Sequence, residues 1–261
     1  MTLVNYRDPA ALADPEGRWV RAGVLHRSAQ PFPAAGPAVV ELLTAAGIRT
    51  VVDLRGAAES EPADWAEAQA AGVEVVAARI DPTSAALEAS MREMTTAADL
   101  GAFYLLMAES APGAVALAVE AAARPGGVLL HCAAGKDRTG LLTALLLDLL
   151  GVPAEEIVAD YARTTDALPQ IFAGLAERNR AALNDYASGA LKVPAPLLEA
   201  PAGAMAAFLE LVATRHGGTE AFLAHCGVDA ATVEAFRAKA AAPATAAATV
   251  VAAPAAGGAA C

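Results

Sequence analysis

The first two thirds of the chain alternate short runs rich in β-branched residues with longer stretches rich in alanine and leucine. This alternation is typical of an α/β fold, in which helices cover the faces of a central sheet. Two predicted helices, residues 37–46 and 62–71, begin at a proline and are followed by a glycine, as helices commonly are. The predicted strands are residues 24–26, 50–54, 73–77 and 128–131.

From residue 139 onward the pattern is almost wholly helical, with Pro153 expected to open one helix and Asp229 to cap the last. The longest apolar run, residues 141–152, contains Asp148 and is shorter than the roughly 20 residues that cross a bilayer. We therefore expect a buried helix and no stable membrane insertion. The predicted fold is α/β, with a central, mostly parallel sheet flanked by helices and a helical C-terminal half.

Residues 1–240 are expected to form a single domain, because no internal repeat or linker divides them. Residues 241–261 are dominated by alanine, carry no charge and end in Cys261. This composition is typical of a disordered tail.

Composition excludes several classes of protein. Hydrophobic residues make up 56% of the 261 residues, which is ample for a core, and the net charge of −11 argues against a nucleic-acid binder. The three cysteines are too few and too scattered for a disulfide framework or a metal site, and therefore indicate a reducing compartment. The N-terminus lacks the pattern of a secretory signal, so we expect a cytoplasmic protein, with export by a route without a signal peptide as the open alternative.

The stretch with the most chemical information is His-Cys-Ala-Ala-Gly-Lys-Asp-Arg-Thr-Gly, residues 131–140, between a predicted strand and a predicted helix. The first N–H groups of a helix lack partners and attract anions. Cys132 would lose its proton readily beside that helix end and the cations Lys136 and Arg138. The Arg138 fork can hold two oxygens of a tetrahedral anion, and the Thr139 hydroxyl can donate to the sulfur.

A plainer interpretation makes Cys132 a buried hydrophobe and Arg138 a solvated charge. A basic triplet ahead of an apolar helix makes poor sense as packing, which favours the chemical interpretation. His225 and Cys226 are adjacent in a helical stretch, so their side chains diverge and we expect them to be packing residues.

The string from His131 to Gly140 closely resembles the phosphate-binding loop, or P-loop, of the bacterial PtpB-like tyrosine phosphatases, a branch of the Cys-x5-Arg phosphatase superfamily. Further family motifs have counterparts across nearly the whole chain except the tail. The opening departs from the family pattern, because Pro9 and Ala10 replace a glycine-rich continuation. The matching segments are Asn5-Tyr-Arg-Asp8, His26-Arg-Ser28, Asp53-Leu-Arg55 and Asp160-Tyr161.

The resemblance implies the phosphatase fold, a cysteinyl-phosphate intermediate formed on Cys132, and neither metal nor cofactor. It assigns the general acid to Asp137, beside Arg138. Asp53, at the end of a predicted strand, is the second candidate, or else a salt-bridge partner of Arg55 or Arg138. Asp81 and Asp99 are weaker candidates that could simply cap turns or helices.

The resemblance also implies the substrates, which are phosphotyrosine and, more broadly, phosphoserine, phosphothreonine or phosphoinositides. An extra cation, Lys136, is typical of phosphoinositide phosphatases. The resemblance suggests that residues 166–195 form a lid over the site, and the alternative is ordinary helical packing. Arg163, just before this segment, either contacts an anionic substrate or is a solvated charge. The predicted substrate-binding residues are Ala133, Ala134, Gly135, Lys136, Thr139, Asp53 and Arg55.

Two other functions remain open at this point. A non-catalytic phosphate reader would need the anion site but not the nucleophile, so the presence of Cys132, Asp137 and Arg138 together argues against it. Arsenate reduction or rhodanese-like sulfur transfer would use the same loop, but arsenate reduction usually needs partner thiols, and neither Cys226 nor Cys261 is visibly placed to serve Cys132.

Overall fold

The computed structural model describes residues 3–9, 20–81, 84–178 and 193–241. At its centre lies a sheet of strands β1 (Leu25–Ser28), β4 (Gly127–His131), β2 (Ile48–Asp53) and β3 (Glu74–Ala77), in that order. All neighbouring strands run parallel, which confirms the predicted sheet. No predicted strand end differs from the observed one by more than two residues.

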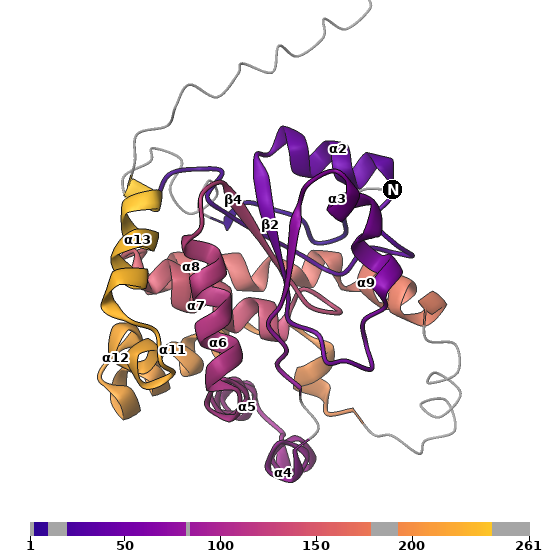
Figure 1. The fold of residues 1–261 in the computed structure, drawn as a ribbon. Coiled ribbons are helices and arrows are strands. Elements are labelled where there is room, and N and C mark those ends of the chain that lie inside the picture. Colours follow the sequence, from indigo (N-terminus) through magenta and orange to yellow (C-terminus); the bar gives the residue numbers. More distant parts are fainter. Residues whose placement is uncertain (1–2, 10–19, 82–83, 179–192, 242–261) are drawn as a thin grey trace, which may run out of the picture.

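Helices cover both faces of this sheet (Figure 1). Successive strand residues point to opposite faces, so Val51 and Leu129 pack with α2 (Pro37–Ala45) and α3 (Ala66–Ala70). Their neighbours Val52 and Leu130 belong to the larger core on the other face, which α6 (Pro112–Ala123) and α7 (Asp137–Leu149) cover. Because both faces are covered, the central strand β4 is buried along its whole length and reads as an almost continuous apolar run.

From α7 to the end of the described chain, every element is a helix or a 3-10 turn, which confirms the helical C-terminal half. Helix α5 (Ala97–Ser110) packs along α11 (Ala202–His216), and this contact is close because a Cβ on Gly101 would lie 2.5 Å from the Ala204 carbonyl oxygen. Asp229 Oδ1 accepts a 2.7 Å hydrogen bond from the Thr232 amide and caps the last helix, as predicted. The remaining helices are α4 (Ala85–Glu93), α8 (Ala154–Ala162), α9 (Thr164–Arg178), the 3-10 turn η2 (Ala195–Leu198), α12 (Thr219–His225) and α13 (Ala230–Ala241).

The predicted helix over residues 62–71 is wrong in detail, because it is split into a 3-10 turn, η1 (Pro62–Trp65), and the short α3. The break lies at Trp65, whose side chain is buried and whose indole N–H donates to His131 on β4 at 3.0 Å. This tertiary contact fixes the backbone at Trp65 outside the helical range. Of the predicted tail, Ala241 ends α13 and residues 242–261 lie outside the described residues.

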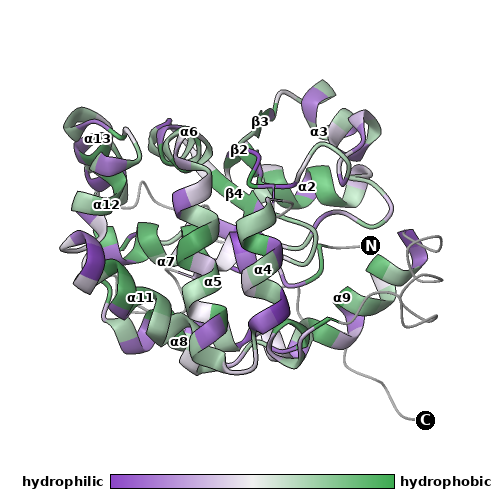
Figure 2. Ribbon diagram, turned by 90° about the horizontal axis from the view of Figure 1, so that it is seen from below, coloured by the Kyte–Doolittle hydropathy of each residue, from purple (hydrophilic) through white to green (hydrophobic). Residues whose placement is uncertain are grey.

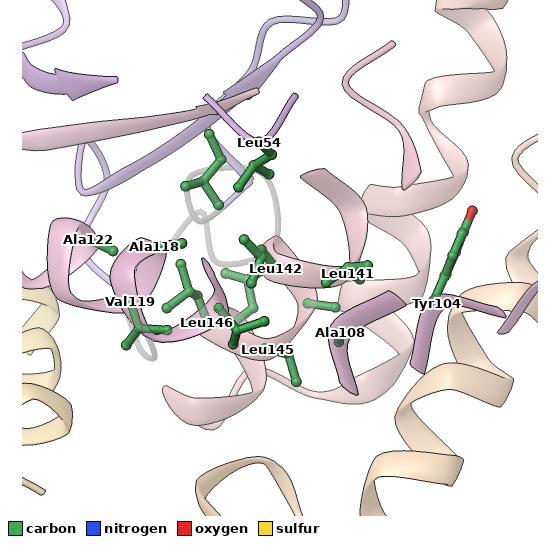
Figure 3. Packing of buried hydrophobic residues seen from close by; sticks show 14 of the residues in the cluster. Leu54, Tyr104, Ala108, Ala118, Val119, Ala122, Leu141, Leu142, Leu145 and Leu146 are labelled. Atoms are coloured by element: carbon green, nitrogen blue, oxygen red, sulfur yellow. The ribbon is translucent and has the colours of Figure 1, made fainter. Parts of the chain in front are cut away.

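Helix α7 is apolar on nearly all sides and lies in the core, as the long leucine-rich run predicted. In Figure 2 it is largely hydrophobic, and Figure 3 shows its leucines packed against alanines and Val119 of α6. Among the described residues, no single helix has the length and apolarity of a membrane span. Helices α5 and α6 meet that criterion only as a pair, and the chain bends by 86° between them.

The four strands end at one edge of the sheet, because all of them are parallel. Register brings Ser28 and Asp53 beside His131, the last residue of β4. The loops that follow β1, β2, β3 and β4 therefore meet there. In parallel sheets this carboxyl edge is where ligand sites form.

Candidate active site

The loop of residues 132–136 joins β4 to the N-terminus of α7 at the carboxyl edge of the sheet. The unpartnered N–H groups of the first turn of α7 make this end attractive to an anion. Gly135 allows the tight return: its φ is +64°, and a Cβ there would overlap the Ser28 carbonyl.

Cys132 and Arg138 meet at this loop. Cys132 is 1% exposed and Arg138 is 9% exposed. Burial by itself lowers the pKa of Arg138, but hydrogen bonds to Glu59 and the negative charge of a Cys132 thiolate raise the pKa overall. The guanidinium is therefore a permanent cation, and its charge interacts with that of the Cys132 side chain.

Glu59, in the loop after β2, fixes the orientation of Arg138. Its two carboxylate oxygens accept hydrogen bonds from both terminal nitrogens of Arg138, the Nη2 to Oε1 bond being 2.8 Å long. The Gly56 amide donates to Glu59 at 2.8 Å and orients it. Glu59 is not among the residues predicted from the sequence, because no motif marks it and it lies 79 positions from Arg138 in the chain.

Arg55, one of the predicted substrate-binding residues, lies at the centre of a buried cluster. It donates to both oxygens of Asp53, at 2.9 and 2.6 Å, and to Gln30 Oε1 at 2.8 Å. Asp64 Oδ2 lies 2.9 Å from Arg55 Nη2. Burial by itself would raise the pKa of Asp53, but the hydrogen bonds of Arg55 help to hold it below the usual value. The structure thus brings Asp53 to Arg55, the salt-bridge alternative, rather than to Arg138.

His131, the last residue of β4, is hydrogen-bonded on both sides of its ring next to Cys132. Burial lowers the pKa of His131 to about 4, so the ring is neutral near pH 7. Because the Trp65 indole can only donate, His131 Nε2 accepts, and Nδ1 carries the hydrogen that faces the Cys132 carbonyl at 3.3 Å. Trp65 is a second residue that sequence analysis did not assign to the site.

The back of the loop is supported by a buried network of charged residues. Arg27 Nη2 donates to the Gly135 carbonyl at 2.8 Å, and Asn5 Nδ2 donates to the same oxygen at 3.0 Å. Asp160 pairs with Arg27 at 2.7 Å and with Arg7 at 2.6 Å. The structure therefore joins three of the sequence motifs that were singled out separately, at the N-terminus, on β1 and on α8.

Asp137, the predicted general acid, stands at the first position of α7 with 23% of its side chain exposed. Its Oδ1 accepts a 2.6 Å hydrogen bond from the Tyr104 hydroxyl. Lys136 is buried, and its ammonium donates to the carbonyls of Leu197 and Glu199 at 2.5 and 2.7 Å and lies 3.3 Å from Asp137 Oδ1. The ammonium is therefore occupied by protein groups.

The other predicted loop residues line the same turn. Ala133 and Ala134 are half-buried, and the Ala133 carbonyl accepts from the Gln30 amide at 3.2 Å. The Thr139 hydroxyl is buried and has no hydrogen-bond partner among the described residues. The predicted donation of this hydroxyl to the Cys132 sulfur is therefore not observed in the structure.

Of the predicted lid, residues 166–178 belong to α9, and residues 179–192 lie outside the described residues. Arg178, near the end of α9, pairs with Asp64 at 2.7 Å, in the segment that follows Glu59. Phe172 on the same helix is 41% exposed. Arg163 is exposed, as expected for a solvated charge.

The remaining candidate residues have simpler surroundings. Asp99 accepts hydrogen bonds from the amides of Thr95 and Thr96 and caps α5. Asp81 follows β3 and lies beside Gly56 together with Glu59. A Cβ on Gly56 would be 3.3 Å from Asp81 Oδ2 and 3.3 Å from Glu59 Oε2. Cys226 is buried, and burial raises its pKa to about 11. It is therefore a packing residue near pH 7, as expected.

Among the described residues, no group of three or more His, Cys, Asp or Glu side chains is placed to hold a metal ion. The charged side chains of the site are instead paired with each other.

Comparison with known proteins agrees with these features. A protein of Cupriavidus necator, whose name assigns it provisionally to the tyrosine-protein phosphatases, is 34% identical over 230 residues, which are 85% of this chain and 81% of that protein. The triple specificity protein phosphatase PtpB of Mycobacterium tuberculosis is 53% identical over 57 residues, 22% of this chain and 20% of PtpB. A tyrosine-protein phosphatase of Nostoc commune is 64% identical over 42 residues, 16% of this chain and 14% of that protein.

Two solved structures of TpbA from P. aeruginosa are also similar, one of them a cysteine-to-serine variant in complex with pTyr. Both are 24% identical with a TM-score of 0.31, and they cover 54% and 53% of this chain and 68% and 67% of TpbA. The profile of the tyrosine phosphatase family matches residues 1–242. With its parallel sheet, its Cys132 loop and this match over nearly its whole length, the chain belongs to the tyrosine phosphatase family, in its bacterial PtpB-like branch.

Proposed function

We propose that the protein hydrolyses phosphate monoesters, phosphotyrosine first among them, through a cysteinyl-phosphate intermediate. The observation that carries this proposal is the position of Cys132 in the loop that leads from β4 into α7, where the charge of its thiolate and the Arg138 guanidinium interact. A nucleophile, a fixed cation and unpartnered backbone N–H groups then surround one tetrahedral site.

In the first step the Cys132 thiolate attacks phosphorus, a sulfur–phosphorus bond forms, and the bond to the ester oxygen breaks. Asp137 gives its proton to the leaving oxygen. In the second step the Asp137 carboxylate takes a proton from water, whose oxygen attacks phosphorus and releases the Cys132 thiolate and inorganic phosphate. Arg138 and the N–H groups of α7 stabilise the charge on the other phosphate oxygens in both steps.

The choice of phosphotyrosine over phosphoinositide rests on the surroundings of the loop. A phosphoinositide carries further phosphates, so a site that binds it well has additional unpaired cations at its mouth. Lys136, the extra cation of the loop, is occupied by two carbonyls and by Asp137. Two carboxylates, Glu59 and Asp81, border the site on the side of Gly56. The relative PtpB is named for triple specificity, so serine and threonine phosphates belong in the test.

The mechanism is tested with p-nitrophenyl phosphate in the presence of a chelator, using the wild type, Cys132→Ser and, as a matched control, Cys226→Ser. Turnover should be lost in the first variant and kept in the second. Rapid acid quench followed by mass spectrometry should find one added phosphoryl group on Cys132. Full activity of Cys132→Ser would overturn the mechanism, and phosphate-ester binding without turnover by the wild type would indicate the phosphate reader.

Substrate class is tested by measuring phosphate release from peptides carrying phosphotyrosine, phosphoserine or phosphothreonine, and from short-chain phosphoinositides. We expect the highest kcat/KM for the phosphotyrosine peptide. A higher value for a phosphoinositide would contradict the assignment based on Lys136, and Lys136→Met would then show whether its ammonium is responsible.

A further inference from the structure

Two buried tyrosines from different helices form a chain of hydroxyl groups that ends on Asp137. Tyr104 of α5 donates to Asp137 Oδ1 at 2.6 Å, and the hydroxyls of Tyr104 and Tyr161 of α8 are 2.6 Å apart. A hydroxyl has one hydrogen. Because Tyr104 uses its hydrogen for Asp137, Tyr161 must donate to Tyr104, which gives the chain a single direction.

Both tyrosines remain donors throughout the working range of pH. Burial, and then the negative charge of Asp137, raise the pKa of Tyr104 and the pKa of Tyr161 above the usual tyrosine value. Their rings are held edge to face at 6.0 Å, and the Tyr104 ring also meets Phe208 at 6.4 Å. Figure 3 shows the Tyr104 ring at the border of the core, with its hydroxyl directed away from the leucines. The donor is therefore held rigidly.

Both polar partners of the Asp137 carboxyl among the described residues lie at the same oxygen. Tyr104 donates to Oδ1, and Lys136 Nζ is 3.3 Å from Oδ1. A proton carried by Asp137 therefore belongs on Oδ2, since Oδ1 is already an acceptor. When that proton leaves, the new negative charge is shared with an oxygen that is already hydrogen-bonded, so the charged form needs no rearrangement.

We propose that Tyr104 and Tyr161 are positioning residues for proton transfer by Asp137, with Tyr104 fixing the carboxyl and Tyr161 fixing Tyr104. This inference rests on the proposed function, in which Asp137 is the proton donor. Neither tyrosine needs to touch the substrate. Their contribution should grow with the amount of proton transfer that the leaving group requires.

The test is a series of aryl phosphates with leaving groups from acidic (p-nitrophenol) to weakly acidic (phenol), assayed with the wild type, Tyr104→Phe and Tyr161→Phe. For phenyl phosphate, Tyr104→Phe should lower kcat/KM about tenfold, the effect of losing one hydrogen bond to a charged group. For p-nitrophenyl phosphate the loss should be about twofold or less, because that leaving group needs little protonation. Tyr161→Phe should show the same trend with a smaller loss.

Three controls separate positioning from structure. Tyr104→Phe leaves the Tyr161 hydroxyl buried without its partner and should therefore lower stability. Combining it with Tyr161→Phe should restore stability, but the loss of kcat/KM should still be larger for phenyl phosphate than for p-nitrophenyl phosphate. Thr143→Val removes a different buried hydroxyl, on α7, and should leave the dependence of kcat/KM on the leaving group as it is in the wild type. In an Asp137→Asn background, Tyr104→Phe should cause no further loss, because the group that it positions no longer transfers a proton.

An equal loss for all leaving groups, or an undiminished loss in the Asp137→Asn background, would overturn the inference while leaving the cysteine mechanism intact. Wild-type turnover that does not depend on Cys132 would instead overturn the proposed function. The two failures are therefore distinguishable by Cys132→Ser alone.

Discussion

Asp160→Asn should destabilise the protein strongly, although it changes a side chain that touches neither sulfur nor phosphate. Asp160 accepts hydrogen bonds from Arg7 at 2.6 Å and from Arg27 at 2.7 Å. The side chains of Arg27 and Asp160 are 1% and 2% exposed. The amide keeps the shape of the carboxylate but removes its charge, so two cations remain in the interior without a counter-ion.

Breaking a buried ion pair by removing one partner costs about 3–5 kcal/mol. For a folded unit of this size that corresponds to a decrease in Tm of about 10 °C. The Gly135 carbonyl depends on Arg27, so kcat/KM should also decrease when Arg27 is free to move. Urea unfolding followed by circular dichroism measures the free energy of unfolding, and an aryl phosphate assay measures the second effect.

The effect should depend on pH in a defined direction. Burial by itself would raise the pKa of Asp160, but Arg27 and Arg7 hold it below the usual value. A carboxyl whose pKa is lower in the folded state stabilises the fold above its unfolded pKa and loses that contribution as the pH falls through the folded pKa. The stability difference between wild type and variant should therefore be constant at neutral pH and shrink below about pH 4.

Asp166→Asn is the matched control, because Asp166 is an exposed carboxylate on the neighbouring helix α9. It should change the free energy of unfolding by less than about 0.5 kcal/mol. If Asp160→Asn were equally mild, the buried network would not support the loop, and the structural reasoning would be wrong.

Three further predictions follow from single contacts. Glu59→Ala should lower kcat about tenfold or more, because Arg138 loses its fixed orientation. Glu61→Ala is the control and should leave kcat unchanged, because Glu61 is exposed and its ion pair with Arg178 is long at 3.6 Å. Equal kcat values for the two variants would refute the role of Glu59. Gly135→Ala should abolish activity and lower Tm, because its Cβ would overlap Ser28; calorimetry and turnover test this, and full activity would contradict it. Lys136→Met should increase amide hydrogen exchange in η2, whose Leu197 carbonyl loses its donor; unchanged exchange would show that the contact is dispensable.

Features that depend on neighbouring residues could be predicted from the sequence. Short runs of β-branched residues located the strands, and the string around Cys132 located the loop between β4 and α7 and the start of α7. The helix over residues 62–71 shows the limit of this reasoning. Its local pattern is helical, but the Trp65 contact with His131 on another strand breaks it.

What only the tertiary structure decided is which charged groups face each other. Glu59 meets Arg138 across 79 positions, Tyr104 meets Asp137 across 33, and Arg27 meets Asp160 across 133. The sequence offered 29 acidic and 18 basic residues, with no local rule to pair them. Strand order decides the pairing, because β4 lies between β1 and β2 and so brings their following loops to the loop of Cys132. Local structure is determined by local sequence, whereas the surroundings of Cys132 depend on contacts that form only when the sheet is assembled.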